Sequence, residues 1–132
     1  MVLKHIIDEN FDSTPRENQG QYGIEFALAF DPSQNLVVQE RVAFVPLQNQ
    51  PPGEYDFQFG IFEMKLASGS FTYTDTDFTH DSVKRFVRPI DRQKVKACVK
   101  KAAGYLIDAV KPNKITMHTD ETHLPPSAMV KY

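Results

Sequence analysis

Two short segments of the chain share the pattern Thr-Asp-x-Thr-His, at residues 76–80 and 119–123. Imidazole and carboxylate groups are suitable ligands for zinc, iron or manganese. Each segment follows a predicted strand, and two strand ends can bring such loops together. The ligands of a metal site built this way would be Asp77, His80, His118, Asp120 and His123. One hypothesis for the function is therefore a metal-dependent hydrolase that uses these two segments.

The other catalytic patterns that we considered are absent from the sequence. Threonine, aspartate and histidine are also ordinary turn residues, and neither segment is the helical His-Glu-x-x-His of zinc proteases. The chain has no phosphate-binding glycine loop and no Gly-x-Ser-x-Gly turn. Its single cysteine, Cys98, lies on the apolar stripe of a predicted helix, where a thiol is normally inert. The sequence therefore favours binding over catalysis and predicts no cofactor.

The charges are distributed very unevenly along the chain. Residues 1–83 carry 13 acidic and 4 basic side chains, whereas residues 84–132 carry 4 acidic and 11 basic ones, for a formal net charge of -2. The basic residues form a dense block that we predict to be the partner-binding surface: Lys84, Arg85, Arg88, Arg92, Lys94, Lys96, Lys100 and Lys101.

This basic block has a structural and a functional interpretation. It is either a solvated helix face that the protein's own acidic sheet partly neutralises, or a contact surface for an anion. Cations near a helix N-terminus oppose the helix dipole at a cost of about 0.3–1 kcal/mol each, which favours the contact surface. Nucleic-acid phosphate is not the favoured anion, because the acidic two thirds of the chain would repel it. An acidic protein surface or a second copy of the chain fits better, and we expect a homo-oligomer.

Strands dominate the first two thirds of the chain. Residues 22–30 alternate with one aromatic face, residues 36–45 are rich in β-branched side chains, and residues 55–66 form a third strand. A change of face at residues 60–62 predicts a β-bulge, and a fourth strand begins at Phe71. Glu25, Glu40, Asp56 and Glu63 alternate with apolar residues, so we expect them on the solvent face of the sheet.

One long helix is predicted from about Arg92 to Val110. Its apolar stripe has helical spacing and consists of Val95, Cys98, Val99, Ala102, Leu106, Ala109 and Val110. Asp91 is placed to cap the N-terminus, Pro112 ends the helix, and residues 114–119 predict a last strand. The fold class is therefore α+β: a mostly antiparallel sheet of four to six strands with one long helix, in the C-terminal half, packed on one face.

The length of 132 residues suits a single domain spanning residues 1–132, with about 122–132 as a tail or truncated terminal element. No apolar run approaches the roughly 18 residues that a membrane span needs, so no membrane contact is expected. The N-terminus lacks the pattern of a signal peptide. A single cysteine permits no internal disulfide. Together these features predict a cytoplasmic protein.

Overall fold

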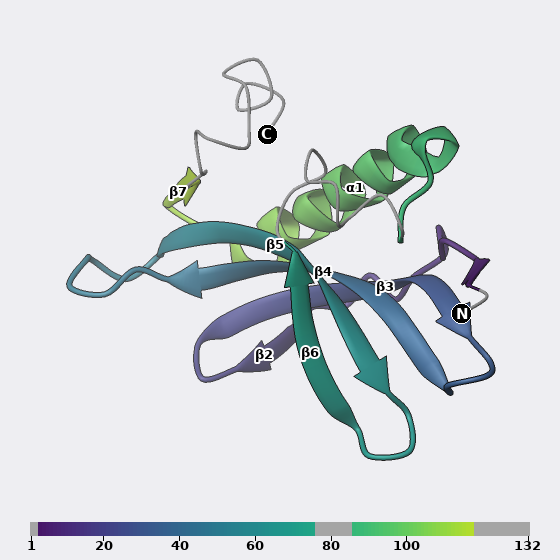
Figure 1. Cartoon of the computed structure of the whole chain (residues 1–132). Coiled ribbons are helices and arrows are strands. Elements are labelled where there is room, and N and C mark those ends of the chain that lie inside the picture. The colour runs from purple at the N-terminus through teal and green to yellow at the C-terminus, as the bar shows by residue number, and fades with distance from the viewer. Residues whose placement is uncertain (1–2, 76–85, 118–132) are drawn as a thin grey trace.

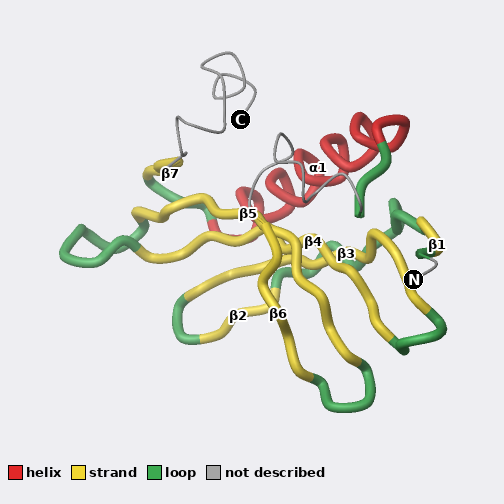
Figure 2. The backbone as a smooth tube through the Cα atoms, in the orientation of Figure 1, coloured by secondary structure: helices red, strands yellow, loops and turns green. Residues whose placement is uncertain are grey.

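The structure is a computed structural model, and it describes residues 3–75 and 86–117. Figure 1 and Figure 2 show the arrangement: a curved sheet, with one long helix lying across one of its faces. In chain order the elements are β1 (Lys4–His5), β2 (Arg16–Asn18), β3 (Gln21–Asp31), β4 (Leu36–Pro46), β5 (Glu54–Lys65), β6 (Ser70–Asp75), the short 3-10 helix η2 (Pro89–Asp91), α1 (Arg92–Val110) and β7 (Lys114–Met117).

The sheet has seven strands, in the order β1-β3-β4-β5-β6, with β2 also paired to β3 and β7 also paired to β5. All pairs are antiparallel except β5 with β7, which is parallel. The sheet is therefore mixed, and the predicted α+β class is confirmed. Five strands have four or more residues, within the predicted range; β1 and β2, of two and three residues, carry too short a pattern to be recognised in the sequence.

The β3–β4 hairpin shows why the sequence turns where it does. Asp31 Oδ1 accepts hydrogen bonds from the Ser33 backbone N–H at 2.9 Å and from the Ser33 hydroxyl at 2.6 Å. Asn35 has a positive φ of 51°, a conformation that asparagine adopts more readily than most residues. The turn brings β3 and β4 together over almost their whole length, from the Tyr22–Phe44 pair to the Asp31–Leu36 pair.

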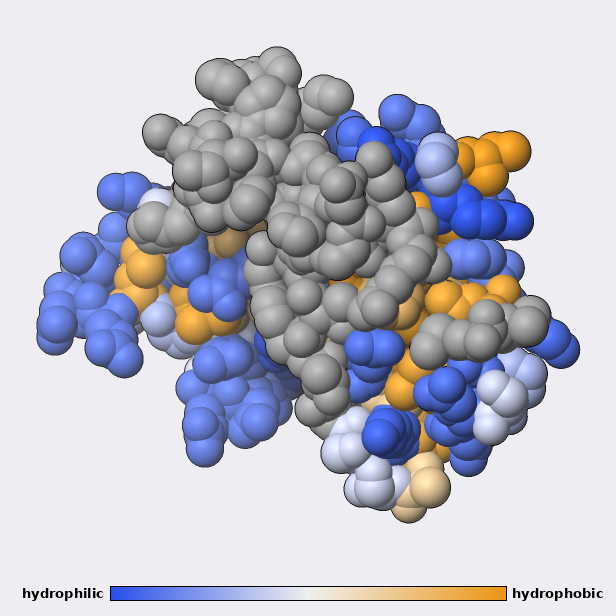
Figure 3. Space-filling model, viewed as in Figure 1, coloured by the Kyte–Doolittle hydropathy of each residue, from blue (hydrophilic) through white to orange (hydrophobic). Residues whose placement is uncertain are grey.

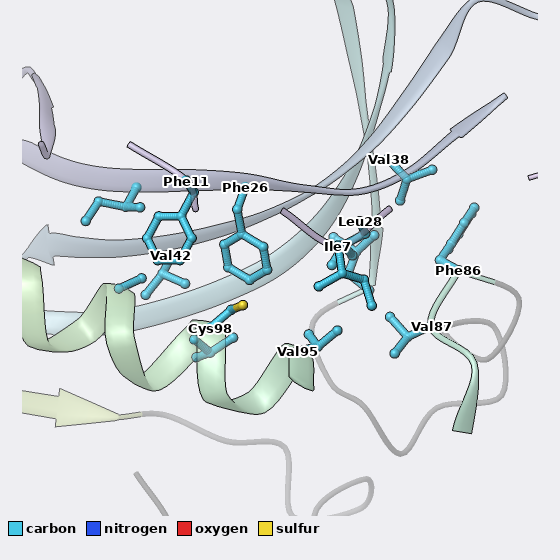
Figure 4. Packing of buried hydrophobic residues seen from close by; sticks show 14 of the residues in the cluster. Ile7, Phe11, Phe26, Leu28, Val38, Val42, Phe86, Val87, Val95 and Cys98 are labelled. Carbon is cyan, nitrogen blue, oxygen red and sulfur yellow. The ribbon is translucent and has the colours of Figure 1, made fainter. Parts of the chain in front are cut away.

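The core lies between the sheet and α1. Alternate side chains of β3, β4 and β5 point toward the helix, and Figure 4 shows Phe26 and Val42 of the sheet facing Cys98 and Val95 of α1. The buried residues of α1 are Val95, Cys98, Val99, Ala102 and Leu106. They confirm the predicted apolar stripe up to Leu106, while Ala109 is exposed and Val110 only half-buried.

The bounds of α1 agree with the prediction, but its N-terminus differs from the expected capping. Asp91 occupies the N-cap position in a helical conformation, and its side chain makes no capping hydrogen bond. Its carboxylate instead accepts from Arg88 Nε at 2.6 Å. At the other end Lys111 adopts the left-handed conformation, with φ 52° and ψ 60°, and its N–H bonds to Ile107 O before Pro112 follows.

Two irregularities bend the long strands. The predicted change of face near residue 61 coincides with a register shift between β5 and β6 at Ile61 and Phe62. A second shift, between Ala27 and Ala29 of β3, was not predicted. Along the described ranges 3–75 and 86–117, no helix has the length and apolar character needed to cross a membrane.

Candidate functional site

The two Thr-Asp-x-Thr-His segments fall outside the described residues. All five predicted metal ligands, Asp77, His80, His118, Asp120 and His123, lie in the ranges 76–85 and 118–132. Within the described part of the chain, no three His, Cys, Asp or Glu side chains are grouped so that they could hold a metal ion. The hydrolase hypothesis thus remains a prediction from the sequence.

The basic block is described from Arg88 onward, since Lys84 and Arg85 also lie outside the described ranges. The structure does not present the six described residues as one uniform surface. They divide into Arg88 just before α1, two lysines on the flank near the protein's own N-terminal segment, and a row of three along the opposite flank. Figure 3 shows strongly hydrophilic residues next to an apolar patch over the N-terminal end of α1.

Arg88 makes an ion pair within the protein, while its side chain remains 53% exposed. Its guanidinium donates to the buried carboxylate of Asp91, which has a side-chain exposure of 8%. The hydrogen bond from Arg88 lowers the pKa of the Asp91 carboxyl group below its ordinary value, although burial acts in the opposite direction. This ion pair fixes the turn that leads into α1, and it gives Arg88 a structural role beside its predicted role in the contact surface.

Lys101 is also engaged, on the flank of α1 that faces the N-terminal segment. Its ammonium group donates to the backbone oxygen of Glu9 at 3.2 Å and lies 5.5 Å from the ring centroid of Phe11. The ring of Tyr105 is 6.0 Å away from the same ammonium group. Lysine over an aromatic face is a favourable cation–π arrangement. This flank therefore belongs to the contact between α1 and residues 8–11.

The segment of residues 8–11 contains two acidic side chains, Asp8 and Glu9. Burial raises the pKa of the Cys98 thiol; Glu9 and Asp8 raise it further, while Lys101 and Lys94 act against them. Two carboxylates and two ammonium groups thus act on this thiol with opposite signs. Lys94 is exposed and belongs to the same side of the helix as Lys101.

The opposite flank carries Arg92, Lys96 and Lys100, which we call the basic row. Their spacing of four residues places them on one side of the helix, over about 12 Å of its length at 1.5 Å per residue. Lys100 is exposed, whereas Arg92 and Lys96 are half-buried. Ile107, 44% exposed, follows on the same side, and Ile90, 83% exposed, precedes the row. The basic row with these two isoleucines is the candidate binding surface.

The charges of α1 are unfavourable for the isolated helix. Its first turn contains no acidic residue and its last turn no basic one. Arg92 and Lys94 thus lie near the positive end of the helix dipole, and Asp108 lies near the negative end. Like charges four residues apart add repulsion of about 0.2–0.5 kcal/mol per pair. The electrostatics of the helix by itself therefore do not favour this arrangement.

A buried carboxyl group was placed wrongly by the sequence prediction. Glu40 is fully buried rather than solvent-facing, and neither carboxylate oxygen has a hydrogen-bond partner in the described structure. Burial raises the pKa of Glu40 well above its ordinary value. The position was recognisable, because Glu40 has the same strand parity as the buried Val38 and Val42. Of the other three carboxylates, Glu25 is exposed as expected, whereas Asp56 and Glu63 are half-buried.

No protein-family model, curated protein or solved structure matches the chain.

Proposed function

We propose that this protein acts by binding, and that the basic row on α1 contacts an acidic protein surface, supplied by another protein or by a second copy of the chain. The observation that carries the proposal is the charge pattern of α1. Arg92 lies in the first turn, at the unfavourable end of the helix dipole, and Lys96 and Lys100 follow it at intervals of four residues on the same side. An acidic partner would relieve the repulsion among them.

The two flanks of the helix support the choice of this surface. The flank with Lys101 is occupied by the chain's own residues, through Glu9 and Phe11. The flank with the basic row adds the exposed Ile107, and Ile90 lies just before it. Positive charge beside exposed apolar side chains suits a protein surface, because apolar contact supplies affinity while charge supplies orientation and association rate. A second copy is an available acidic partner, since residues 1–83 carry most of the acidic side chains.

The test is a double charge reversal, Arg92→Glu with Lys100→Glu. The control is Lys4→Glu with Lys65→Glu, which changes the net charge equally at two exposed positions of the sheet. Binding to poly-L-glutamate and self-association are both measured by sedimentation at low and high salt. We expect the wild type to bind at least one of the two acidic surfaces at low salt, and salt to weaken that contact because surface charges are screened over about 8–10 Å.

The two double variants distinguish an effect of the basic row from an effect of the net charge of the protein. The reversal on α1 should abolish the association, while the reversal on the sheet should preserve it. The α1 variant should also unfold no more easily than the wild type, because glutamate near the helix N-terminus is favourable. Equal behaviour of the two variants, or a wild type that binds neither poly-L-glutamate nor itself, would contradict the proposal.

A further inference from the structure

A cavity of about 330 Å³ lies on the face of the sheet away from α1. Residues 12–16 form one wall, with Asp12, Thr14 and Arg16; the sheet contributes Glu25, Gln39 and Met64. Its volume is at the lower end of the range found for small-molecule sites, about 300–1,000 Å³. The cavity is distinct from the basic row, which lies on the helix.

A local turn and a strand pair bring these side chains to the cavity. Phe11 is buried in the core, while Asp12, Thr14 and Arg16, which follow it, are all exposed. Residues 12–14 form a turn that the Asp12 carboxylate closes. Arg16 begins β2 and pairs with Gly23 of β3, and paired residues of neighbouring strands project to the same face of a sheet.

A glycine keeps the floor of the cavity open. Gly23 is buried, and a Cβ atom added there would lie 3.0 Å from Arg41 Nη2 and 3.3 Å from Arg41 Cζ. The guanidinium of Arg41 therefore lies directly against the backbone of Gly23. On the other side of β3, the residue paired with this glycine is Arg16 of β2.

Both signs of charge are present around the cavity. Arg41 Nε lies 3.6 Å from Glu25 Oε1, and the two side chains are about one third exposed, at 30% and 35%. Asp12 Oδ1 accepts from the Thr14 N–H at 2.9 Å. The charged side chains that line the cavity are Arg16, Asp12 and Glu25, so a simple anion or cation would meet like charge as well as opposite charge. A molecule with one charge of each sign would match both.

We propose that this cavity binds a small zwitterion, a free α-amino acid with an apolar side chain. Arg16 holds its carboxylate, Asp12 and Glu25 hold its ammonium group, and the thioether of Met64 contacts its side chain. Guanidinium and carboxylate form directional charge-assisted hydrogen bonds, which suit the recognition of both ends of such a molecule. This site is independent of the basic row and of the proposed function.

The experiment uses the full chain, labelled with ¹⁵N, and follows chemical shifts during titration with L-leucine, N-acetyl-L-leucine and L-leucinamide. The acetyl group removes the ammonium charge, and the amide removes the carboxylate. We expect saturable binding of leucine with a dissociation constant below about 1 mM, and affinities about tenfold lower for each capped compound, because one charged hydrogen bond is lost.

Two variants test which residue binds the carboxylate of the ligand and which binds its ammonium group. Arg16→Gln should weaken leucine and N-acetyl-leucine while leaving leucinamide unchanged; Asp12→Asn should weaken leucine and leucinamide while leaving N-acetyl-leucine unchanged. Lys65→Gln, at an exposed position of the sheet, should alter nothing. The Arg92→Glu, Lys100→Glu variant should retain leucine binding, so failure of the two proposals can be distinguished. Absence of saturation up to about 20 mM leucine, or the same loss for all three compounds in Arg16→Gln, would overturn this proposal.

Discussion

The two faces of the sheet place a carboxyl group in opposite environments, one in contact with solvent and one buried. On the outer face Glu25 is exposed and pairs with Arg41 on the neighbouring strand. On the inner face, one residue before Arg41 in β4, Glu40 is fully buried between Phe26 of β3 and Ile61 of β5. Glu25 lies in contact with solvent and a nearby cation, while desolvation of Glu40 raises the pKa of its carboxyl group and favours the protonated form.

This difference shows that strand parity, rather than residue type, decides which side of the sheet a side chain occupies. Moving Glu40 to the outer face would also turn Val38 and Val42 toward solvent, because a slip of one residue moves every side chain of the strand to the other face. The free energy gained by burying these apolar side chains exceeds the cost of burying the single carboxyl group. The inner face therefore tolerates an unfavourable residue, which gives the stability of the fold a component that depends on pH.

The largest effect is expected where the inner face meets α1. Leu106→Ala should lower the free energy of unfolding by about 2–5 kcal/mol, because Leu106 is completely buried and the deletion leaves a cavity. Ile107→Ala is the matched control, since this neighbouring side chain is 44% exposed. Urea denaturation measures both. Equal losses for the two variants would mean that Leu106 is not packed against the sheet.

Substitution of Glu40 is expected to have the next largest effect, with the opposite sign. Glu40→Met removes a buried polar group without a described hydrogen bond, so we expect a gain of about 1–3 kcal/mol in unfolding free energy at pH 7. Glu25→Met on the outer face is the control and should bring no such gain. Loss of stability in Glu40→Met would show that the carboxyl group makes a stabilising contact in the native protein.

The pH dependence of Glu40 sharpens the same comparison. Its folded pKa is raised by burial, so above the unfolded value of about 4.3 the folded state holds a proton that the unfolded state has released. This contribution makes wild-type stability fall by about 1.4 kcal/mol per pH unit until the folded pKa is reached. Glu40→Gln should remove that slope, and its advantage over wild type should grow as the pH rises from about 4.3. Parallel pH profiles for wild type and Glu40→Gln would contradict the assignment.

The sequence predicted the bounds of the helix and strands better than the contacts that their side chains make. The bounds of α1 and its buried stripe as far as Leu106 followed from helical spacing, and the β3–β4 hairpin followed from the turn residues at 31–35. Two features were not predicted. Asp91 pairs with Arg88, three residues earlier, instead of capping the helix, because two local partners compete for the same carboxylate. Lys101 contacts Glu9 and Phe11, which are about 90 residues away in the sequence and so could not be identified from local pattern. For the site, periodicity placed the basic row on the polar side of α1, but it did not reveal which basic residues the chain itself engages.

Asp91 lies at the rim of the core, and its substitution should have a smaller effect with the reverse dependence on pH. Because Arg88 lowers the folded pKa of Asp91, this carboxylate contributes stability above its unfolded pKa of about 3.9 and loses that contribution as the pH falls through the folded value. Asp91→Asn should therefore be less stable than wild type at pH 7, and the difference should shrink in acid. Thermal unfolding across pH 2–7 measures it, and a difference that grows in acid would refute the ion pair.

The smallest effect is expected on the outer face, at Glu25 and Arg41. Their 3.6 Å contact is about one third exposed, so water and salt screen the attraction and fixing two long side chains offsets part of the gain. A double-mutant cycle with Glu25→Gln and Arg41→Gln should give a coupling free energy of about 0.2–1 kcal/mol, which decreases in high salt. Such a small value would mean that the charges of the outer face are held mainly by the sheet and remain available to a ligand. A coupling above about 2 kcal/mol would instead make this pair part of the structural framework, as buried charge pairs are.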